Sequence, residues 1–191
     1  VKITSDGSAV IDCTMDYSGR RSVLRKYFRN PREREQSLFN YFGNIIPSLT
    51  VKDVSVHNVD RYDDPFKLCV RGESIALATP GKGGLILQPV ISKSILYGYI
   101  RYDTRKFPLY VSDAIDERES YIYDLPVEYA GGKISREIKV DAPYGSARIS
   151  VHRKAGDHRL FVEKSILIKK NIITPDAYGK FVEFCSKIKN A

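Results

Sequence analysis

Apolar residues recur at every second position between residues 9 and 17. The apolar members of this run are Ala9, Ile11, Cys13, Met15 and Tyr17. A period of two places successive side chains on opposite faces, so the run predicts a β-strand with one buried face. Ser5-Asp6-Gly7, directly before it, is a turn signal. We therefore expect a hairpin between residues 2–4 and 9–17.

Helical spacing marks the next two segments. Within residues 20–29, the side chains of Leu24, Tyr27 and Phe28 share one helical face, which we expect to be buried. Asn30-Pro31 then supplies a capping residue and a first-turn proline, so a second helix is expected from Pro31 to about Phe42. Its expected buried side chains are Leu38, Tyr41 and Phe42.

Short apolar runs separated by turn residues fill most of the remaining chain. The expected strands are residues 51–59, 66–70, 74–78, 85–87, 107–111, 120–123, 127–129, 134–140, 147–152 and 159–169. Lys52-Asp53 disturbs the alternation of the first, and residues 80–84 are expected to form a hairpin loop. Short strands with turns at such intervals predict an antiparallel β-sandwich rather than alternating βαβ units.

The chain ends on a segment with a helical start signal. Thr174 is a capping residue and Pro175 suits the first helical position. The apolar stripe that follows consists of Tyr178, Phe181, Cys185 and Ile188. We expect this helix to dock on the sheet. The predicted fold is mainly β (α+β), an antiparallel β-sandwich with two helices near the N-terminus and one docked C-terminal helix. Residues 1–191 are expected to form one β-rich module, with any internal boundary near residues 101–106.

Composition narrows the class of protein. The chain has 191 residues, of which 42% are hydrophobic and 28% charged. Its longest apolar runs are far shorter than the roughly 20 residues of a membrane helix, so no membrane span is expected. Because the sequence opens on Val1-Lys2-Ile3 without a leader-like pattern, we interpret it as a piece of a longer protein or a processed product. A net charge of +8 is moderate for this length, and nucleic acid is not an expected partner.

The strongest electrostatic signal is a basic run over the two N-terminal helices. Its members are Arg20, Arg21, Arg25, Lys26, Arg29, Arg32 and Arg34. A solvated basic face or an interdomain contact explains such a run, and the alternative is an anion-binding or glycan-binding site. The 13 tyrosines also invite a sugar-binding interpretation, but strand positions such as Tyr121, Tyr123 and Tyr129 are explained by packing.

No catalytic or metal motif is complete. Cys13, His57 and Asp60 or Asp63 follow the chain order of a thiol-enzyme triad, but Cys13 lies inside an alternating strand and is expected to be a core thiol. His152 and His158, with Asp157, supply fewer ligands than structural zinc requires. We expect no cofactor and no metal. The three cysteines, which lack CxxC spacing, are Cys13, Cys69 and Cys185, and we expect buried free thiols.

Four short motifs follow one another in the second half of the chain. They are Arg105-x-x-Pro108, Leu125-Pro126-x-x-Tyr129, Ala142-Pro143-Tyr144-Gly145 and Ile173-x-Pro175-x-x-Tyr178. In this order they resemble the C-terminal region of bacterial transglutaminase-like proteins, in which a β-sandwich domain of unknown function follows a papain-like Cys-His-Asp core. Asp6-Gly7-Ser8-Ala9 and Tyr17-Ser18-Gly19 are similar to the segment directly after that core. Gly179 departs from the pattern, because a helix-forming residue is usual there.

The resemblance implies a non-catalytic accessory domain that packs on the catalytic core or positions the core or its polymeric substrate. The core itself would lie outside this sequence, so no catalytic residue is carried over to any position here. An upstream transglutaminase-like domain of the same polypeptide is the implied partner, with a cell-wall or glycan polymer as a second. Secretion to the periplasm or cell surface of a Bacteroidetes-type bacterium is implied as well.

Overall fold

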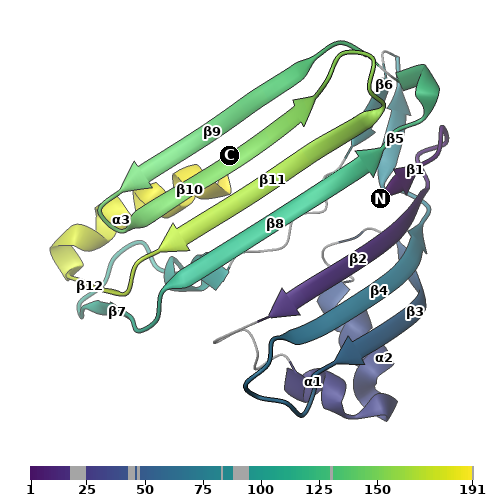
Figure 1. The fold of residues 1–191 in the computed structure, drawn as a ribbon. Helices are drawn as coiled ribbons and strands as arrows, with labels where there is room; N and C mark the ends of the chain where they lie inside the picture. The colour runs from purple at the N-terminus through teal and green to yellow at the C-terminus, as the bar shows by residue number, and fades with distance from the viewer. Residues whose placement is uncertain are drawn as a thin grey trace. The chain divides into compact units, whose positions relative to one another are not determined.

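The chain folds into two compact units, each considered on its own (Figure 1). A computed structural model describes residues 1–17, 25–42, 46, 48–82, 84–87, 95–129 and 131–190. Unit 1 comprises Val1–Ile91 together with Tyr123–Ala130. Unit 2 comprises Ser92–Ile122 together with Gly131–Ala191. Whether residues 1–191 act as one module stays a prediction.

The main sheet of unit 1 has the strand order β3-β4-β2-β1, and neighbouring strands are antiparallel. The strands are β1 (Lys2–Ile3), β2 (Ala9–Tyr17), β3 (Leu49–His57) and β4 (Phe66–Ser74). The predicted hairpin of β1 and β2 is confirmed, and the Asp6 carboxylate in its turn accepts the Ser8 N–H at 3.0 Å. The register of β3 shifts between Val51 and Asp53, where polar residues break the alternation.

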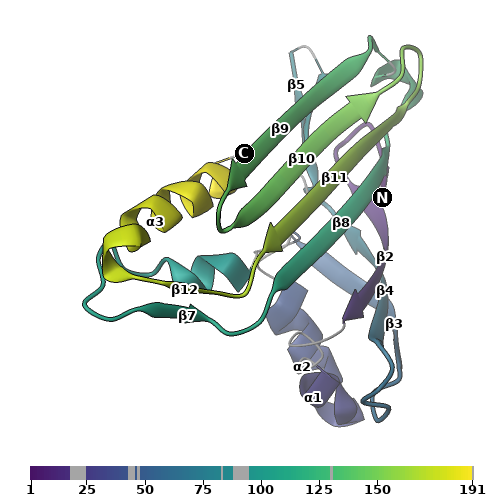
Figure 2. The ribbon, with the colours of Figure 1, turned by 60° about the vertical axis from the view of Figure 1, so that its left-hand side comes forward.

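Two helices lie on one face of this sheet (Figures 1 and 2). They are α1 (Arg25–Arg29) and α2 (Pro31–Phe42), and the predicted bounds of the second are confirmed. The Asn30 side chain caps α2, since its Oδ1 accepts the N–H of Arg32 at 3.1 Å. The ring of Phe28 stacks on that of Phe66 with centroids 5.7 Å apart, which fixes α1 to the sheet.

The remaining elements of unit 1 are short. Strands β5 (Ala78–Gly81) and β6 (Gly84–Leu87) form the expected hairpin. Residues 127–129, expected to be a strand, are instead the 3-10 turn η3 (Val127–Tyr129). The N–H of Tyr129 donates to the carbonyl of Pro126 at 2.9 Å, because the proline favours a turn at this point and cannot donate to a strand ladder.

The main sheet of unit 2 has the order β8-β11-β10-β9. The strands are β8 (Ile115–Asp124, the last two residues in unit 1), β9 (Ile134–Ala142), β10 (Gly145–Arg153) and β11 (Arg159–Ile168). Strand β10 is antiparallel to both of its neighbours. At the turn into β10, a Cβ on Gly145 would lie 2.0 Å from the carbonyl oxygen of Leu167, so only glycine fits there.

A strand pair and a 3-10 helix complete the backbone of unit 2. Strands β7 (Leu109–Val111) and β12 (Asn171–Ile173) pair antiparallel, and η2 (Ile95–Tyr99) is a 3-10 helix. Neither β12 nor η2 was expected from the sequence.

Helix α3 (Pro175–Lys189) covers one face of the unit 2 sheet, as Figure 2 shows. The predicted stripe of four residues is fully buried, and Phe184 joins it. This stripe packs against Ile166 and Ile168 of β11 in one continuous core. The Tyr178 hydroxyl donates to the carbonyl oxygens of Tyr99 (3.1 Å) and Tyr102 (2.8 Å). Thr174 occupies the N-cap position, but its side chain makes no capping hydrogen bond.

The predicted β-rich (α+β) fold class is confirmed, with two helices near the N-terminus and one docked C-terminal helix. The strand pairing is mixed rather than wholly antiparallel, because Lys2 of β1 pairs parallel with Asp124 of β8. In each unit the helices leave the opposite face of the sheet to polar side chains. Among the described residues, no helix is both long and apolar enough to cross a bilayer.

Candidate functional site

The basic run over α1 and α2 does not act as one surface. Arg20 and Arg21 lie outside the described residues. Arg25 is only 3% exposed. Its guanidinium donates to three backbone carbonyl oxygens, those of Asn58 (3.3 Å), Arg61 (2.5 Å) and Asp64 (2.9 Å). Arg25 therefore holds the loop between β3 and β4 in place and is turned away from solvent.

Two other arginines of the run also have partners within unit 1. Arg29 Nε lies 2.8 Å from Asp60 Oδ1 in an exposed ion pair. The guanidinium of Arg34 donates to the carbonyl oxygen of Phe28 at 3.3 Å, which ties α2 to α1. Both contacts are structural, and the Arg29 pair is of the exposed kind that contributes little stability.

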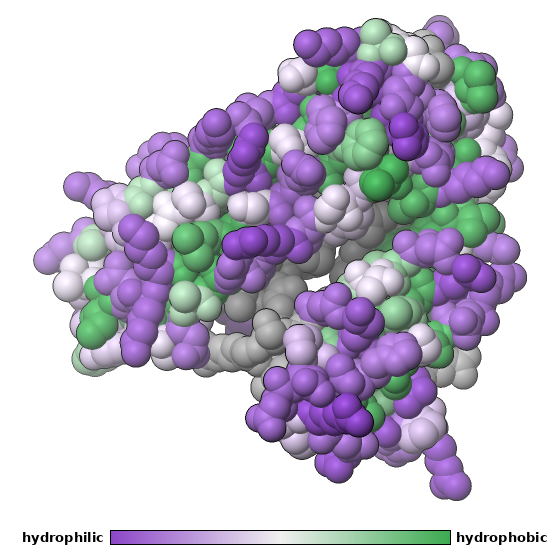
Figure 3. Space-filling model, viewed as in Figure 1, coloured by the Kyte–Doolittle hydropathy of each residue, from purple (hydrophilic) through white to green (hydrophobic). Residues whose placement is uncertain are grey.

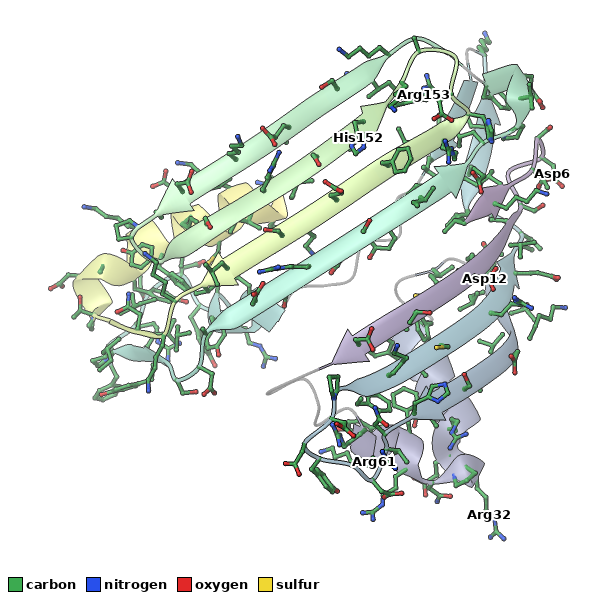
Figure 4. All side chains as sticks on the ribbon, viewed as in Figure 1. Asp6, Asp12, Arg32, Arg61, His152 and Arg153 are labelled. Carbon is green, nitrogen blue, oxygen red and sulfur yellow. The ribbon has the colours of Figure 1, made fainter. Side chains whose placement is uncertain are left out.

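Lys26 and Arg32 are exposed as well, like Arg29. Figure 4 shows Arg32 pointing away from the sheet of unit 1. Lys26 Nζ lies 4.7 Å from the ring centroid of Tyr27. The expected burial of Tyr27 is wrong, since half of its surface is exposed while Phe28 takes the inward position on this one-and-a-half-turn helix. Leu24 lies outside the described residues.

The fold does not bring Cys13 and His57 of the thiol-enzyme triad together. Cys13 is paired with Val70, a buried residue of β4, whereas His57 is paired with Lys67. Because Val70 and Lys67 are an odd number of positions apart on one strand, Cys13 and His57 point to opposite faces of the sheet. Cys13 and Cys69 are half-buried rather than buried, and Cys185 is fully buried as expected. Cys69 lies on the face opposite the buried Leu68 and Val70, beside the Thr14 hydroxyl.

The histidine and carboxylate candidates have separate local roles. Asp157 accepts the backbone N–H of Arg159 at 2.9 Å, and this hydrogen bond is the main reason that its pKa lies below the usual value. His158 Nδ1 is 4.0 Å from the same carboxylate. His152 stacks on Phe161, with ring centroids 5.0 Å apart. Within the described ranges, no group of three or more His, Cys, Asp or Glu side chains is placed to hold a metal ion.

Unit 2 contains a buried ion pair that was not predicted from the sequence. Lys164 Nζ lies 3.1 Å from Glu119 Oε1, and the two side chains are 3% and 13% exposed. The Tyr121 hydroxyl donates to the second Glu119 oxygen at 2.7 Å. Each charge is thus compensated where it is removed from water, which is the arrangement expected of a structural ion pair.

The solvent face of the unit 2 sheet carries a shallow polar hollow. This face of the sheet is turned toward the reader in Figures 3 and 4. Its lining includes Arg118, Ser120, Arg148, Ser150, Glu163 and Ser165. His152 and Phe161 follow Ser150 and Glu163 on the same face, because each is two positions away along its strand. Small hydroxyl side chains between arginines, next to a stacked ring pair, form a flat surface with many hydrogen-bonding groups.

Strands β7 and β12 expose an apolar surface, which we call the β7–β12 surface and define as Tyr110 and Ile172. Their exposed fractions are 63% and 60%. Tyr110 and Ile172 are directly paired across the two strands, so their side chains share one face. The neighbouring Leu109, Val111 and Ile173 point inward to the core. Figure 3 shows apolar atoms at the end of unit 2 that carries these strands.

The sequence indicates this surface only weakly. Residues 109–111 alternate inward and outward, and Ile172-Ile173 pairs with them. A three-residue run is too short for periodicity to identify, and the two strands are about 60 residues apart in the chain, so the sequence pattern did not reveal the pairing.

Comparison with known proteins gives one family match. Residues 83–191 match the model of a domain of unknown function with a solved structure, DUF3858. These residues contain all of unit 2 and the 123–130 stretch of unit 1. No curated protein and no solved structure matches the chain.

Proposed function

The chain belongs to the DUF3858 family of domains of unknown function, and we propose that it is a non-catalytic accessory domain of a transglutaminase-like or peptidase-like protein. In this role it packs on the catalytic core, or positions the core or its polymeric substrate. The proposal rests on the sequence motifs at 105–129 and 173–184 and on one structural observation, the β7–β12 surface.

The β7–β12 surface supports the proposal because exposed apolar side chains on a rigid strand pair suit a protein interface. Single exposed apolar residues are common on any protein. Here, however, Tyr110 and Ile172 are held side by side, with their backbone fixed by strand pairing and by the core beneath it. Aromatic residues of this kind are enriched at protein interfaces, where they carry much of the binding free energy.

The polar hollow on the sheet of unit 2 supports the other part of the proposed role, which is to position a polymeric substrate. Its hydroxyl and guanidinium groups, next to the His152–Phe161 ring pair, suit an extended polar polymer such as a glycan or peptide strand. The motif resemblance further leads us to propose a periplasmic or cell-surface location in a Bacteroidetes-type bacterium.

Binding to a separately produced transglutaminase-like catalytic domain tests the proposal. We expect the chain to bind in calorimetry, and the double variant Tyr110→Ser/Ile172→Ser to weaken the complex about 30-fold, as for loss of interface hot spots. The matched control is Ile75→Ser/Val127→Ser, which changes two apolar residues that are even more exposed and lie outside the surface. Equal loss in both variants, or isopeptide or thiol-ester turnover by the isolated chain, would contradict the proposal.

Anion or glycan binding by the N-terminal helices is the second candidate. The exposed Lys26–Tyr27 pair, with Arg32 on the next helix, is the observation that favours it. Lys26→Ala/Arg32→Ala should then abolish retention on heparin-like or cell-wall polymers, and retention should fall steeply with salt. Retention that is unchanged by this double variant would count against the site. Arg25 is unsuitable for the test, because it holds a loop.

A further inference from the structure

Strand β9 forms an open edge of the unit 2 sheet. One side of β9 pairs with β10 from Ile134 opposite Arg153 to Ala142 opposite Gly145. In the described part of the chain, no strand pairs with its other side. Its backbone N–H and C=O groups on that side are therefore available to a further strand.

The side chains that flank the middle residue of β9 carry opposite charges. Ile138 is the midpoint of the strand and is 42% exposed. An acid, Glu137, precedes it and a base, Lys139, follows it, both on the polar face of the sheet. The two are in contact within the monomer, with Lys139 Nζ 3.0 Å from Glu137 Oε2.

We propose that the open edge of β9 pairs with β9 of a second copy of this chain. The strands would run antiparallel about a two-fold axis at Ile138. In this register Ile138 meets its own counterpart, and Glu137 lies opposite the partner's Lys139 on both sides of the axis. Opposite charges directly across a strand pair are stabilising, and an isologous interface makes each favourable contact twice.

The same charges exclude the neighbouring registers. Antiparallel strands that continue both faces of the sheet can shift the axis only by whole residues, so the nearest alternatives have the axis at Glu137 or at Lys139. An axis at Glu137 would place two copies of Glu137 opposite each other. An axis at Lys139 would place Lys139 opposite Lys139, and Glu137 opposite Asp141. Like charges directly opposite are destabilising, so the pattern selects Ile138.

A groove lies beside this edge, on the side of the sheet that α3 covers. Helix α3 runs alongside β9, as Figures 1 and 2 show. The groove between them is lined by Ile138, Val140, Glu183, Ser186, Lys187 and Asn190. The helical members are spaced three and four residues apart, so they form one face of α3.

The proposed register also places a base of the second copy in this groove. Arg136 of the partner lies opposite Val140, on the side of the sheet that α3 covers. The Glu183 carboxylate, now 2.8 Å from Lys187 Nζ, lines that part of the groove. A second copy thus adds an apolar contact at Ile138 and places its Arg136 beside Glu183. Both contacts are complementary to the side chains exposed along this edge.

Sedimentation velocity on the 191-residue chain tests the pairing. We expect a reversible monomer–dimer equilibrium between low micromolar and near-millimolar concentrations. Ile138→Lys and Ile138→Glu should each weaken the dimer at least about tenfold, because each places like charges together on the axis. An equimolar mixture of the two variants should restore association, because Lys then faces Glu.

The control is Ile122→Lys, which alters an isoleucine of similar exposure (46%) on β8, away from the edge. This variant should dimerise like the wild type. Amide hydrogen exchange on the wild-type chain is an independent measurement. The protection of residues 134–142 from exchange should rise with protein concentration. A wild type that stays monomeric throughout, or a mixture that fails to associate, would overturn the proposal and leave the edge to a strand from another protein.

Discussion

Arg25 illustrates how a single buried cation can organise a loop. Three carbonyl oxygens between residues 58 and 64 accept hydrogen bonds from its guanidinium. Arg25→Ala removes these charged donors and leaves a cavity, so we expect the free energy of unfolding to fall by about 2 to 4 kcal/mol. Urea denaturation followed by circular dichroism measures this change.

Arg32→Ala is the matched control for Arg25→Ala, because Arg32 belongs to the same basic run but is exposed. Its effect on the free energy of unfolding should stay within about 0.5 kcal/mol. Similar losses in both variants would mean that general charge, rather than the carbonyl contacts, determines the stability of this region.

Cys185 offers a second test at the residue scale. Burial raises the pKa of its thiol to about 12. At pH 8 roughly one molecule in ten thousand would carry the thiolate, which is the form that reacts with iodoacetamide. Mass spectrometry of the folded chain should find Cys13 and Cys69 alkylated well before Cys185. The Cys185 rate should rise about tenfold per pH unit below this pKa; a rate equal to that in urea would contradict burial.

At the scale of elements, α3 contains a residue that weakens it. Gly179 lies in the helix, and a Cβ added there would meet no atom within 4 Å. Gly179→Ala should therefore raise the free energy of unfolding by about 1 kcal/mol, because alanine loses less backbone entropy in a helix. Thermal denaturation followed by circular dichroism measures the gain.

Gly145→Ala provides the contrasting variant in the same unit. Its Cβ would lie 2.0 Å from the carbonyl oxygen of Leu167, so this change should destabilise the chain. If Gly179→Ala were also destabilising, α3 would be packed more closely at that position than its surroundings indicate.

The local sequence pattern correctly predicted elements that are long or that begin with a capping residue. The alternation of residues 9–17 identified β2, Asn30-Pro31 marked the start of α2, and all four predicted residues of the α3 stripe are buried. It failed at Val127–Tyr129, where Pro126 directs a turn. It also missed Asn171–Ile173, which is a strand only because β7 lies beside it. Short elements of this kind depend on distant partners.

The candidate sites show the same limit. Charge alone marked the basic run, yet the carbonyl oxygens that bury Arg25 come from a loop more than 30 residues away. The β7–β12 surface likewise depends on a pairing between distant segments. A linear pattern gives the chemistry of a side chain, and tertiary contacts decide whether solvent reaches it.

At the scale of the whole molecule, the two units differ in how the chain builds them. Both stretches of unit 2 lie within residues 92–191, which also hold its core. We expect this fragment to unfold cooperatively in a thermal scan. Residues 1–91 lack Tyr123, which is fully buried, and Asp124, which pairs with Lys2, so this fragment should show no cooperative transition. A sharp transition in residues 1–91 alone would contradict the assignment of 123–130 to unit 1.

The return of the chain to unit 1 at Tyr123–Ala130 has a consequence for biosynthesis. The ribosome makes residues 1–91 first, but the last strand residue beside β1 is Asp124. Unit 1 must therefore wait, incomplete, until residues 123–130 have emerged, while β9, β10, β11 and α3 emerge only after them. Nascent-chain proteolysis should find the N-terminal segment sensitive until that point, a period in which chaperones have access to its apolar strands.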